Sequence, residues 1–234
     1  MKNINFTHEA KKGLSTIPLT PLDLDPELKT IEVEGGKIEL GVYGADKIEK
    51  IVFCTIMLHE TSVLESTAMV WPDDNHNFPA LWLNLTIVPS VMNVPIFDFV
   101  PMMDYVVWPE YAEKYIAPVL NLREIAMEIL GNEVIDKAAD LPSKSIYTLS
   151  PYKVVAKISD NGIEKVPEIL HEYINGYIDI WRNSAPINDK NEKDFYVRKK
   201  TAVRELMKAN DPGYFFMVNV FGEDMTRKVF NEVF

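Results

Sequence analysis

The sequence is poor in the residues that bind metals and form disulfides. It contains one cysteine, Cys54, so no intrachain disulfide can form, which fits a reducing cytoplasm. None of its four histidines stands in an H-x-x-x-H or C-x-x-C arrangement. The G-x-G-x-x-G, Walker and G-x-S-x-G motifs are absent as well. The sequence therefore gives no support for a metal signature, a nucleotide site or a serine hydrolase.

Long apolar runs and positive charge are also scarce. No apolar run reaches about 18 residues, and no hydrophobic segment of the signal-peptide type follows Met1-Lys2-Asn3. We therefore expect a soluble, cytoplasmic protein without a signal peptide or a membrane partner. The net charge of −11 is opposite in sign to that of a typical nucleic-acid binder, so no nucleic-acid partner is expected.

One local group of cations stands out near the C-terminus. Lys199, Lys200 and Arg204 lie in a helical segment, and residues 200, 204 and 208 share one face at i, i+4 spacing. Two interpretations remain open: a basic patch that binds an acidic protein, or an ordinary solvated helix face.

A run of strands with short links occupies the first half of the chain. Each segment is rich in β-branched and aromatic residues and is bounded by turn residues. Pro95 and Pro101 should confine the last strand to its ends or to a sheet edge. Consecutive strands with short links predict an antiparallel meander. The expected segments are a hairpin at 32–40 turning at Gly35-Gly36 and strands at 50–58, 63–71, 80–88 and 94–102.

The second half of the chain is mostly helical. The strongest predicted helix is 163–181, whose apolar residues recur at i, i+3 and i+4 and so should face a core. A chain of 234 residues can bury such a core without disulfides or metals. We expect an α/β fold: one domain over 1–234, built as a three-layer α/β/α sandwich around a mainly antiparallel sheet. The other expected elements are a helix at 110–130 with a kink at Pro118, a strand at 145–158, and helices at 193–209 and 213–232.

The segment 80–88 carries a polar group on an otherwise apolar strand. Its leucines alternate onto a core face, while Trp82, Asn84 and Thr86 point the other way. If Asn84 is buried, it must have a hydrogen-bond partner. A planar apolar ligand over this face would account for Trp82. The alternative is that Asn84 faces solvent or is satisfied by the backbone.

Neighbouring segments offer further polar candidates. Glu65 and Thr67 share one face of the preceding strand, and His59 lies at the end of the strand before it. Asp98, between two phenylalanines, is better interpreted as a structural acceptor than as an edge charge. Cys54 is better interpreted as a small buried hydrophobe than as a nucleophile.

Asp211 has two compatible interpretations. An aspartate followed by proline is typical of a helix N-cap. Cap hydrogen bonds would lower the pKa of this carboxyl group, whereas a proton donor near neutral pH needs a raised pKa, obtained by burial. The sequence does not decide between the two.

A series of short motifs in fixed order resembles the ferredoxin-dependent bilin reductases. The resemblance covers about residues 48–234, and the order of the motifs and the C-terminal tail carry most of its weight. The motifs are Val70-Trp71-Pro72, Asn77-Phe78-Pro79, Phe97-Asp98-Phe99-Val100-Pro101, Leu149-Ser150-Pro151, Asp211-Pro212-Gly213-Tyr214, Phe221-Gly222-Glu223 and Val229-Phe230-Asn231-Glu232-Val233-Phe234.

The resemblance implies reduction of an open-chain tetrapyrrole, bound between the sheet and the C-terminal helices. Electrons would come one at a time from external reduced ferredoxin, and the protein would hold no flavin or metal. Protein carboxylates would supply protons, with Asp211 matching the substrate-facing aspartate of the family. We expect a monomer with biliverdin or a related bilin as substrate and ferredoxin as partner.

One departure concerns Asn84, where the resemblance places an aspartate in most members. An amide cannot act as a general acid in the same sense, so Asn84 would orient the substrate. Protons would then come from Asp211, Glu65, His59 or a water molecule. The further substrate-binding residues expected from these considerations are Trp82, Thr86, Glu65, Thr67 and Ser150, with Lys199, Lys200 and Arg204, and Arg182 behind them, for the propionate groups.

Three functional hypotheses follow. The first is a reductase of biliverdin or another linear tetrapyrrole, including one derived from chlorophyll, as the related red chlorophyll catabolite reductases use. The second is a non-catalytic carrier or sensor that binds a tetrapyrrole in the same pocket. The third is an unrelated α+β protein that binds no tetrapyrrole.

Overall fold

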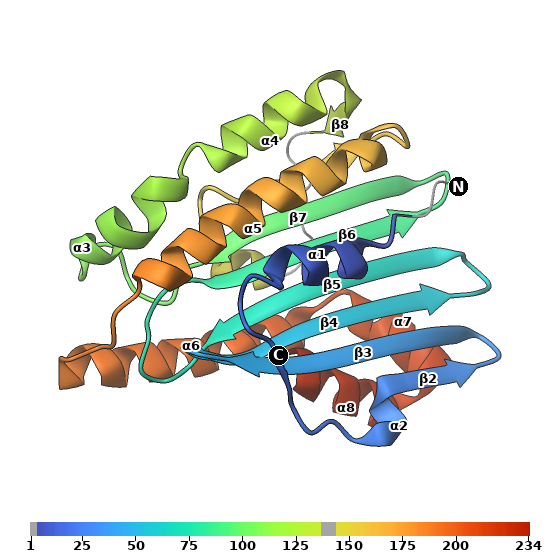
Figure 1. The fold of residues 1–234 in the computed structure, drawn as a ribbon. Coiled ribbons are helices and arrows are strands. Elements are labelled where there is room, and N and C mark those ends of the chain that lie inside the picture. Colours follow the sequence, from blue (N-terminus) through green and yellow to red (C-terminus); the bar gives the residue numbers. More distant parts are fainter. Residues whose placement is uncertain (1–3, 137–143) are drawn as a thin grey trace.

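The computed structural model of the protein describes residues 4–136 and 144–234. Within them, one antiparallel sheet of ten strands runs in the order β1-β3-β4-β5-β6-β7-β10-β8, with β2 beside β3 and β9 beside β7. The long central strands follow one another as a meander, and helices gather on both sides of the sheet (Figure 1).

The strands and helices have the following bounds. The strands are β1 Thr20–Pro21, β2 Thr30–Val33, β3 Gly36–Ala45, β4 Ile48–Leu58, β5 Val63–Pro72, β6 Ala80–Val88, β7 Met92–Val100, β8 Val134–Asp136, β9 Val154–Val155 and β10 Lys157–Ile158. The helices are α1 Phe6–Leu14, α2 Pro26–Lys29, α3 Pro109–Tyr111, α4 Leu122–Leu130, α5 Val166–Asn183, α6 Lys190–Asn210, α7 Gly213–Phe221 and α8 Glu223–Val233.

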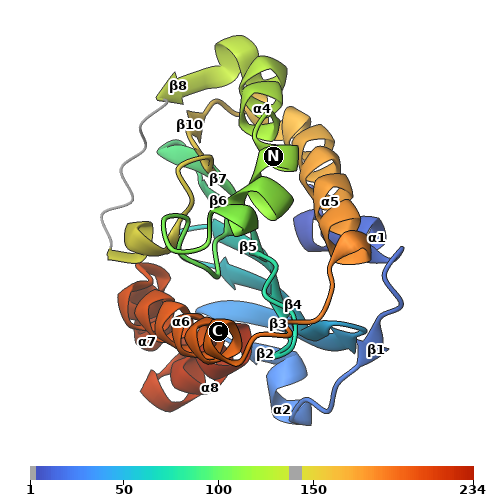
Figure 2. The same cartoon turned by 90° about the vertical axis from the view of Figure 1, so that its left-hand side faces the viewer.

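The two faces of the sheet meet different helices. On β7, the ring of Phe99 stacks on Tyr173 of α5 at 5.4 Å, and Phe97 contacts Phe6 of α1. Trp82 on β6 points to the opposite face, which α6, α7 and α8 cover (Figure 2). The expected α/β class with a large antiparallel sheet is therefore confirmed, and helices lie against both of its faces.

The central strands agree closely with the prediction. The strand expected at 80–88 has these bounds, and those at 50–58 and 63–71 differ from β4 and β5 by one or two residues. Pro95, however, lies inside β7 and not at its end. The strands β9 and β10 pair with β7, but the pairing is interrupted at Ala156, beside Pro95. Pro95 has no N–H group to donate, so it can lie where β7 has no paired residue on that side.

Three predicted elements are wrong as continuous segments. The helix expected at 110–130 is broken into α3, a π-helical turn at 112–116, a 3₁₀ turn at 117–119 and α4, because Pro118 supplies no backbone N–H. The strand expected at 145–158 is a 3₁₀ turn at 144–148 followed by the short strands β9 and β10. The helix expected at 213–232 is divided into α7 and α8 at Gly222, whose φ of +81° suits glycine.

In the described ranges, 4–136 and 144–234, no helix combines the length and apolar character needed to cross a membrane.

We expect Phe99→Ala to lower the free energy of unfolding by about 3–5 kcal/mol, because it removes a buried ring from the contact between β7 and α5. Phe215→Ala is the matched control, since that ring is 76% exposed on α7 and its loss should change stability by less than about 0.5 kcal/mol. Urea denaturation of both variants measures the difference. Equal stability losses would contradict the assignment of this face as the core.

Candidate functional site

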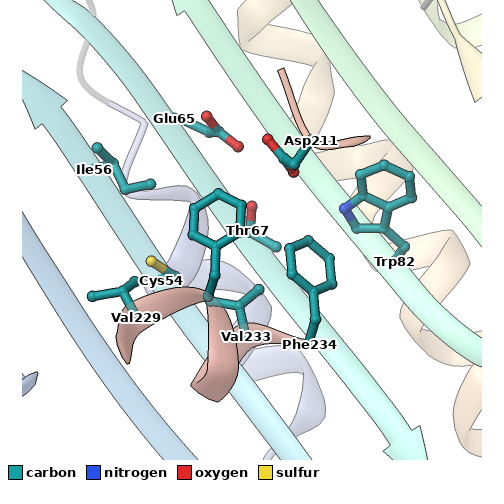
Figure 3. Close-up of a pocket in the computed structure, with 10 residues that line it drawn as sticks. Cys54, Ile56, Glu65, Thr67, Trp82, Asp211, Val229, Val233 and Phe234 are labelled. Atoms are coloured by element: carbon teal, nitrogen blue, oxygen red, sulfur yellow. The ribbon is translucent and has the colours of Figure 1, made fainter. Parts of the chain in front are cut away.

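A small cavity lies between the central strands and the C-terminal helices (Figure 3). The space that water-sized groups can occupy there is about 20 Å³, enough for a single water molecule. Strands β4, β5 and β6 form its floor, α8 forms its roof, and Asp211 closes one side. The lining residues are Cys54, Ile56, Glu65, Thr67, Trp82, Asp211, Val229, Phe230, Val233 and Phe234.

Two carboxyl groups meet at this cavity from distant parts of the sequence. Glu65 rises from β5, and Asp211 lies in the link between α6 and α7. A methyl group placed on Gly213 would lie 3.0 Å from Asp211 Oδ1 and 3.2 Å from Glu65 Oε2. Because Gly213 has no side chain, nothing separates the two acids at this point, and the link can lie directly over the sheet.

The environment favours the neutral form of both acids. Burial raises the pKa of Glu65 strongly, and the negative charge of the neighbouring Asp211 raises it further. Burial also raises the pKa of Asp211, although the backbone N–H of Gly213, 2.7 Å from Oδ1, partly offsets this. Asp211 therefore accepts a backbone hydrogen bond and still has a raised pKa. The N-cap of α7 is Pro212 and not Asp211, so the N-cap prediction is wrong by one residue, while the role of Asp211 as a proton donor stays a prediction. Burial and the negative charge of Asp211 shift the release of protons from this pair to a higher pH than that of ordinary carboxyl groups.

Asn84 is buried and fully bonded by side chains. Its Nδ2 group donates to Thr67 Oγ1 at 2.8 Å and to Glu65 Oε1 at 3.2 Å. Its Oδ1 accepts from Thr86 Oγ1 at 3.1 Å. The expected partner for a buried Asn84 is therefore present, and the solvent-facing and backbone alternatives are excluded. In this arrangement the amide fixes the position of the Glu65 carboxyl group.

Asp98 brings a third acid to the same face of the sheet. It pairs across the strands with Trp82 and is 1% exposed. Both the backbone N–H and the hydroxyl of Ser150 donate to its carboxylate. Burial raises the pKa of Asp98 to about 6, and the bonds from Ser150 work against this rise. The interpretation of Asp98 as a structural acceptor agrees with these contacts. Ser150, a predicted substrate-binding residue, lies against Asp98 and does not line the cavity.

The predicted basic residues do not line the cavity. Lys200 is buried and pairs with Glu49 and Asp74, while Arg204 pairs with Glu49 and donates to the carbonyl oxygen of Phe234. Lys199 donates to the carbonyl oxygen of Met103. Lys200 and Arg204 thus face the protein, so this part of α6 is not a solvated helix face.

Two further predicted residues also lie away from the cavity. His59 is exposed at the end of β4 and contacts the carbonyl oxygen of Glu34. Arg182 ends α5, on the opposite face of the sheet.

The resemblance implied a site beneath the C-terminal helices, but the side chains that form the roof of the cavity were not predicted. The roof consists of Val229, Phe230 and Val233 of α8 and of Phe234, which follows α8. Cys54 and Ile56 complete the floor. The i, i+4 spacing of Val229 with Val233, and of Phe230 with Phe234, is the signal that could have identified this face. Its position over Glu65 depends on tertiary packing.

Comparison with known proteins places this site in a family. Residues 7–234 match the model of the ferredoxin-dependent bilin reductases. The chain belongs to this family. The family takes its electrons from ferredoxin and is not known to need a flavin or a metal, and membership supports an oxidoreductase role. The described residues contain no group of three or more His, Cys, Asp or Glu side chains that could hold a metal ion.

Two relatives illustrate the similarity. The 15,16-dihydrobiliverdin:ferredoxin oxidoreductase of Nostoc punctiforme is 22% identical over 194 residues, which cover 81% of this chain and 75% of the relative. The structure of phytochromobilin synthase from tomato, in complex with biliverdin, superposes with a TM-score of 0.81 at 16% identity. The match covers 97% of this chain and 81% of the tomato protein.

We expect the free energy of unfolding of the wild-type protein to fall between pH 5 and pH 8, and Glu65→Gln to make this fall smaller. In the wild-type protein the folded state holds a proton on Glu65 above the pH at which an unfolded glutamate releases it. The free energy of unfolding should therefore fall as pH rises from that value through the raised folded pKa. The glutamine of the variant does not titrate, so this contribution disappears.

Urea denaturation at pH 5 and pH 8 measures the difference. Glu60→Gln, an exposed change in the turn after β4, is the control. Parallel pH dependences for wild type and Glu65→Gln would show that the pKa of Glu65 is not raised.

Proposed function

We propose that this protein reduces a linear tetrapyrrole, biliverdin or a related bilin, by successive one-electron transfers from reduced ferredoxin. The observation that carries the proposal is the half-buried pair of Glu65 and Asp211, which faces Trp82 beneath an apolar roof in a member of this family. An aromatic and apolar cavity suits a planar, conjugated ligand, and a few polar groups fix its orientation.

In the proposed reaction, the protein supplies protons and the electrons arrive from outside. Reduction of one double bond consumes two electrons and two protons. Asp211 and Glu65 are the proposed donors, since a general acid works best when its pKa lies near the operating pH. Asp211 is half-buried, so it can recover protons from solvent.

Asn84 is proposed to act on the substrate through Glu65. Both of its N–H groups are already donated, one to Glu65 and one to Thr67, so neither is directed at a ligand. Thr86 completes the chain of bonds by fixing the amide oxygen. This arrangement holds the Glu65 carboxyl group toward the cavity.

Substrate binding requires the site to widen. A space of about 20 Å³ is far below the roughly 300–1,000 Å³ of ligand pockets. At least one element that borders the site must therefore move when a tetrapyrrole enters. The propionate groups of a bilin would need cations other than Lys200 and Arg204, because both already pair with Glu49.

The test of the proposed function is an absorbance titration of the purified protein with biliverdin, followed by anaerobic addition of reduced ferredoxin. We expect a bound spectrum that shifts to shorter wavelength, because reduction shortens the conjugated system. Binding without a spectral change on reduction would favour the carrier hypothesis, or a reductase of another tetrapyrrole. Absence of binding would contradict the proposal.

We expect Asp211→Asn to bind biliverdin with an affinity close to that of the wild type and to reduce it at least about 100-fold more slowly, the usual contribution of general acid catalysis. Electron transfer would continue, so a substrate radical should accumulate and be visible by electron paramagnetic resonance. Asp224→Asn is the matched control on the exposed first turn of α8. Full activity of Asp211→Asn would remove this residue from the mechanism.

A further inference from the structure

The last turn of α8 is held by side chains from three other elements. A helix leaves the carbonyl groups of its last turn without partners inside the helix. Here Lys50 of β4, Trp71 of β5 and Arg204 of α6 donate to them, and we call these three residues the C-terminal clamp. Lys50 Nζ donates to the backbone oxygens of Asn231 at 3.4 Å and Glu232 at 2.7 Å. Trp71 Nε1 donates to the backbone oxygen of Val233 at 3.2 Å, and Arg204 Nε donates to the backbone oxygen of Phe234.

The clamp residues also support one another. The guanidinium group of Arg204 lies 5.0 Å from the centre of the Trp71 ring, and its Nη1 pairs with Glu49. Burial and the nearby Arg204 lower the pKa of Lys50 to about 8. Burying two cations side by side is costly, and their bonds to the end of α8 and to Glu49 offset that cost. The C-terminal end of α8 is therefore held in place by specific hydrogen bonds from the C-terminal clamp.

The adjoining helix α7 is held by side-chain packing, with Tyr214 against Phe230 of α8 and Val220 and Phe221 beside the turn at Gly35 and Gly36. Of its nine residues only Met217 is buried, and Phe215 and Phe216 are 76% and 64% exposed. It contains no charged residue, and Gly222 separates it from α8. In Figure 1, α7 lies at the end of the C-terminal helices that is remote from the clamped terminus.

We propose that Lys50, Trp71 and Arg204 are positioning residues of the candidate site: they fix α8 as its roof, so that the site widens by movement of α7 and not of α8. The proposal rests on the proposed function, because it concerns the same cavity. The clamped turn carries Val233 and Phe234, which line the cavity beside Phe230. A fixed roof limits the access of water to Glu65 and Asp211, and this partial burial is what raises the pKa of both acids.

Lys47 offers a matched control on the other side of the sheet. Its Nζ group donates to the carbonyl oxygens of Trp181, Arg182 and Ser184 at 3.1, 3.3 and 2.9 Å, at the end of α5. Lys47→Met therefore removes the same kind of helix-end contact as Lys50→Met. It does so far from the roof of the cavity, since α5 packs on the opposite face.

Cys54 provides a probe that needs no substrate. It is the only cysteine of the chain, is 2% exposed and lines the cavity under α8. Burial raises the pKa of its thiol, so reaction with the thiol reagent DTNB requires the roof to open. We expect Lys50→Met, Trp71→Phe and Arg204→Met to react about tenfold faster than wild type in native buffer, and Lys47→Met to react at the wild-type rate.

Kinetics with biliverdin and reduced ferredoxin separate positioning from general stability. In the clamp variants we expect kcat to fall about tenfold while KM changes less than threefold, because the acids become hydrated but the route past α7 is unchanged. Equal DTNB rates for Lys47→Met and Lys50→Met, or an unchanged kcat despite faster labelling, would overturn the positioning role. Faster labelling of the clamp variants in a protein whose wild type does not bind biliverdin would contradict the proposed function and leave the attachment of α8 supported.

Discussion

The structure of the site depends on one electrostatic constraint, the partial burial of two acids at the same point. Glu65 and Asp211 both lie close to Gly213, and the lining of their cavity contains no lysine or arginine in the part of the chain that the structure describes. Two unpaired carboxylates could not both remain charged there, so at least one holds a proton. The apolar roof that raises the pKa of both groups is thus also what keeps protons available beside Trp82.

Some elements of the fold hold the residues of the site in fixed positions, whereas another is packed more loosely. The antiparallel strands fix Glu65, Asn84 and Trp82 on one face, because alternate residues of paired strands point the same way. The link after α6 brings Asp211 over that face, and the bonds at the end of α8 hold the roof. Helix α7 buries one residue of nine, fewer than α6 or α8, so of the three C-terminal helices it loses the least buried surface on moving.

Much of the sheet could be predicted, because it follows from local alternation of residues. The bounds of β6, the common face of Trp82, Asn84 and Thr86, and the need of Asn84 for a partner all came from that pattern. The contact between Asp211 and Glu65 joins residues far apart in sequence, so no local signal contains it. The i, i+4 cations of α6 were ambiguous for the same reason. Lys200 and Arg204 face inward because Glu49 and the end of α8 lie there, which only the tertiary structure shows.

The fold matches that of a solved structure at only 16% identity, so the fold alone does not fix the chemistry of the site, which depends on its side chains. Asp98 accepts two bonds from Ser150, which favour its charged form, whereas Glu65 accepts one from Asn84 and faces the charge of Asp211. Glu65 therefore holds a proton to higher pH than Asp98. Asn84 places no further negative charge beside Glu65, and its amide group holds the Glu65 carboxyl group in position. In the proposed reaction, proton delivery is then concentrated at the end of the cavity where Glu65 and Asp211 meet, and the substrate bond that lies there is the one reduced.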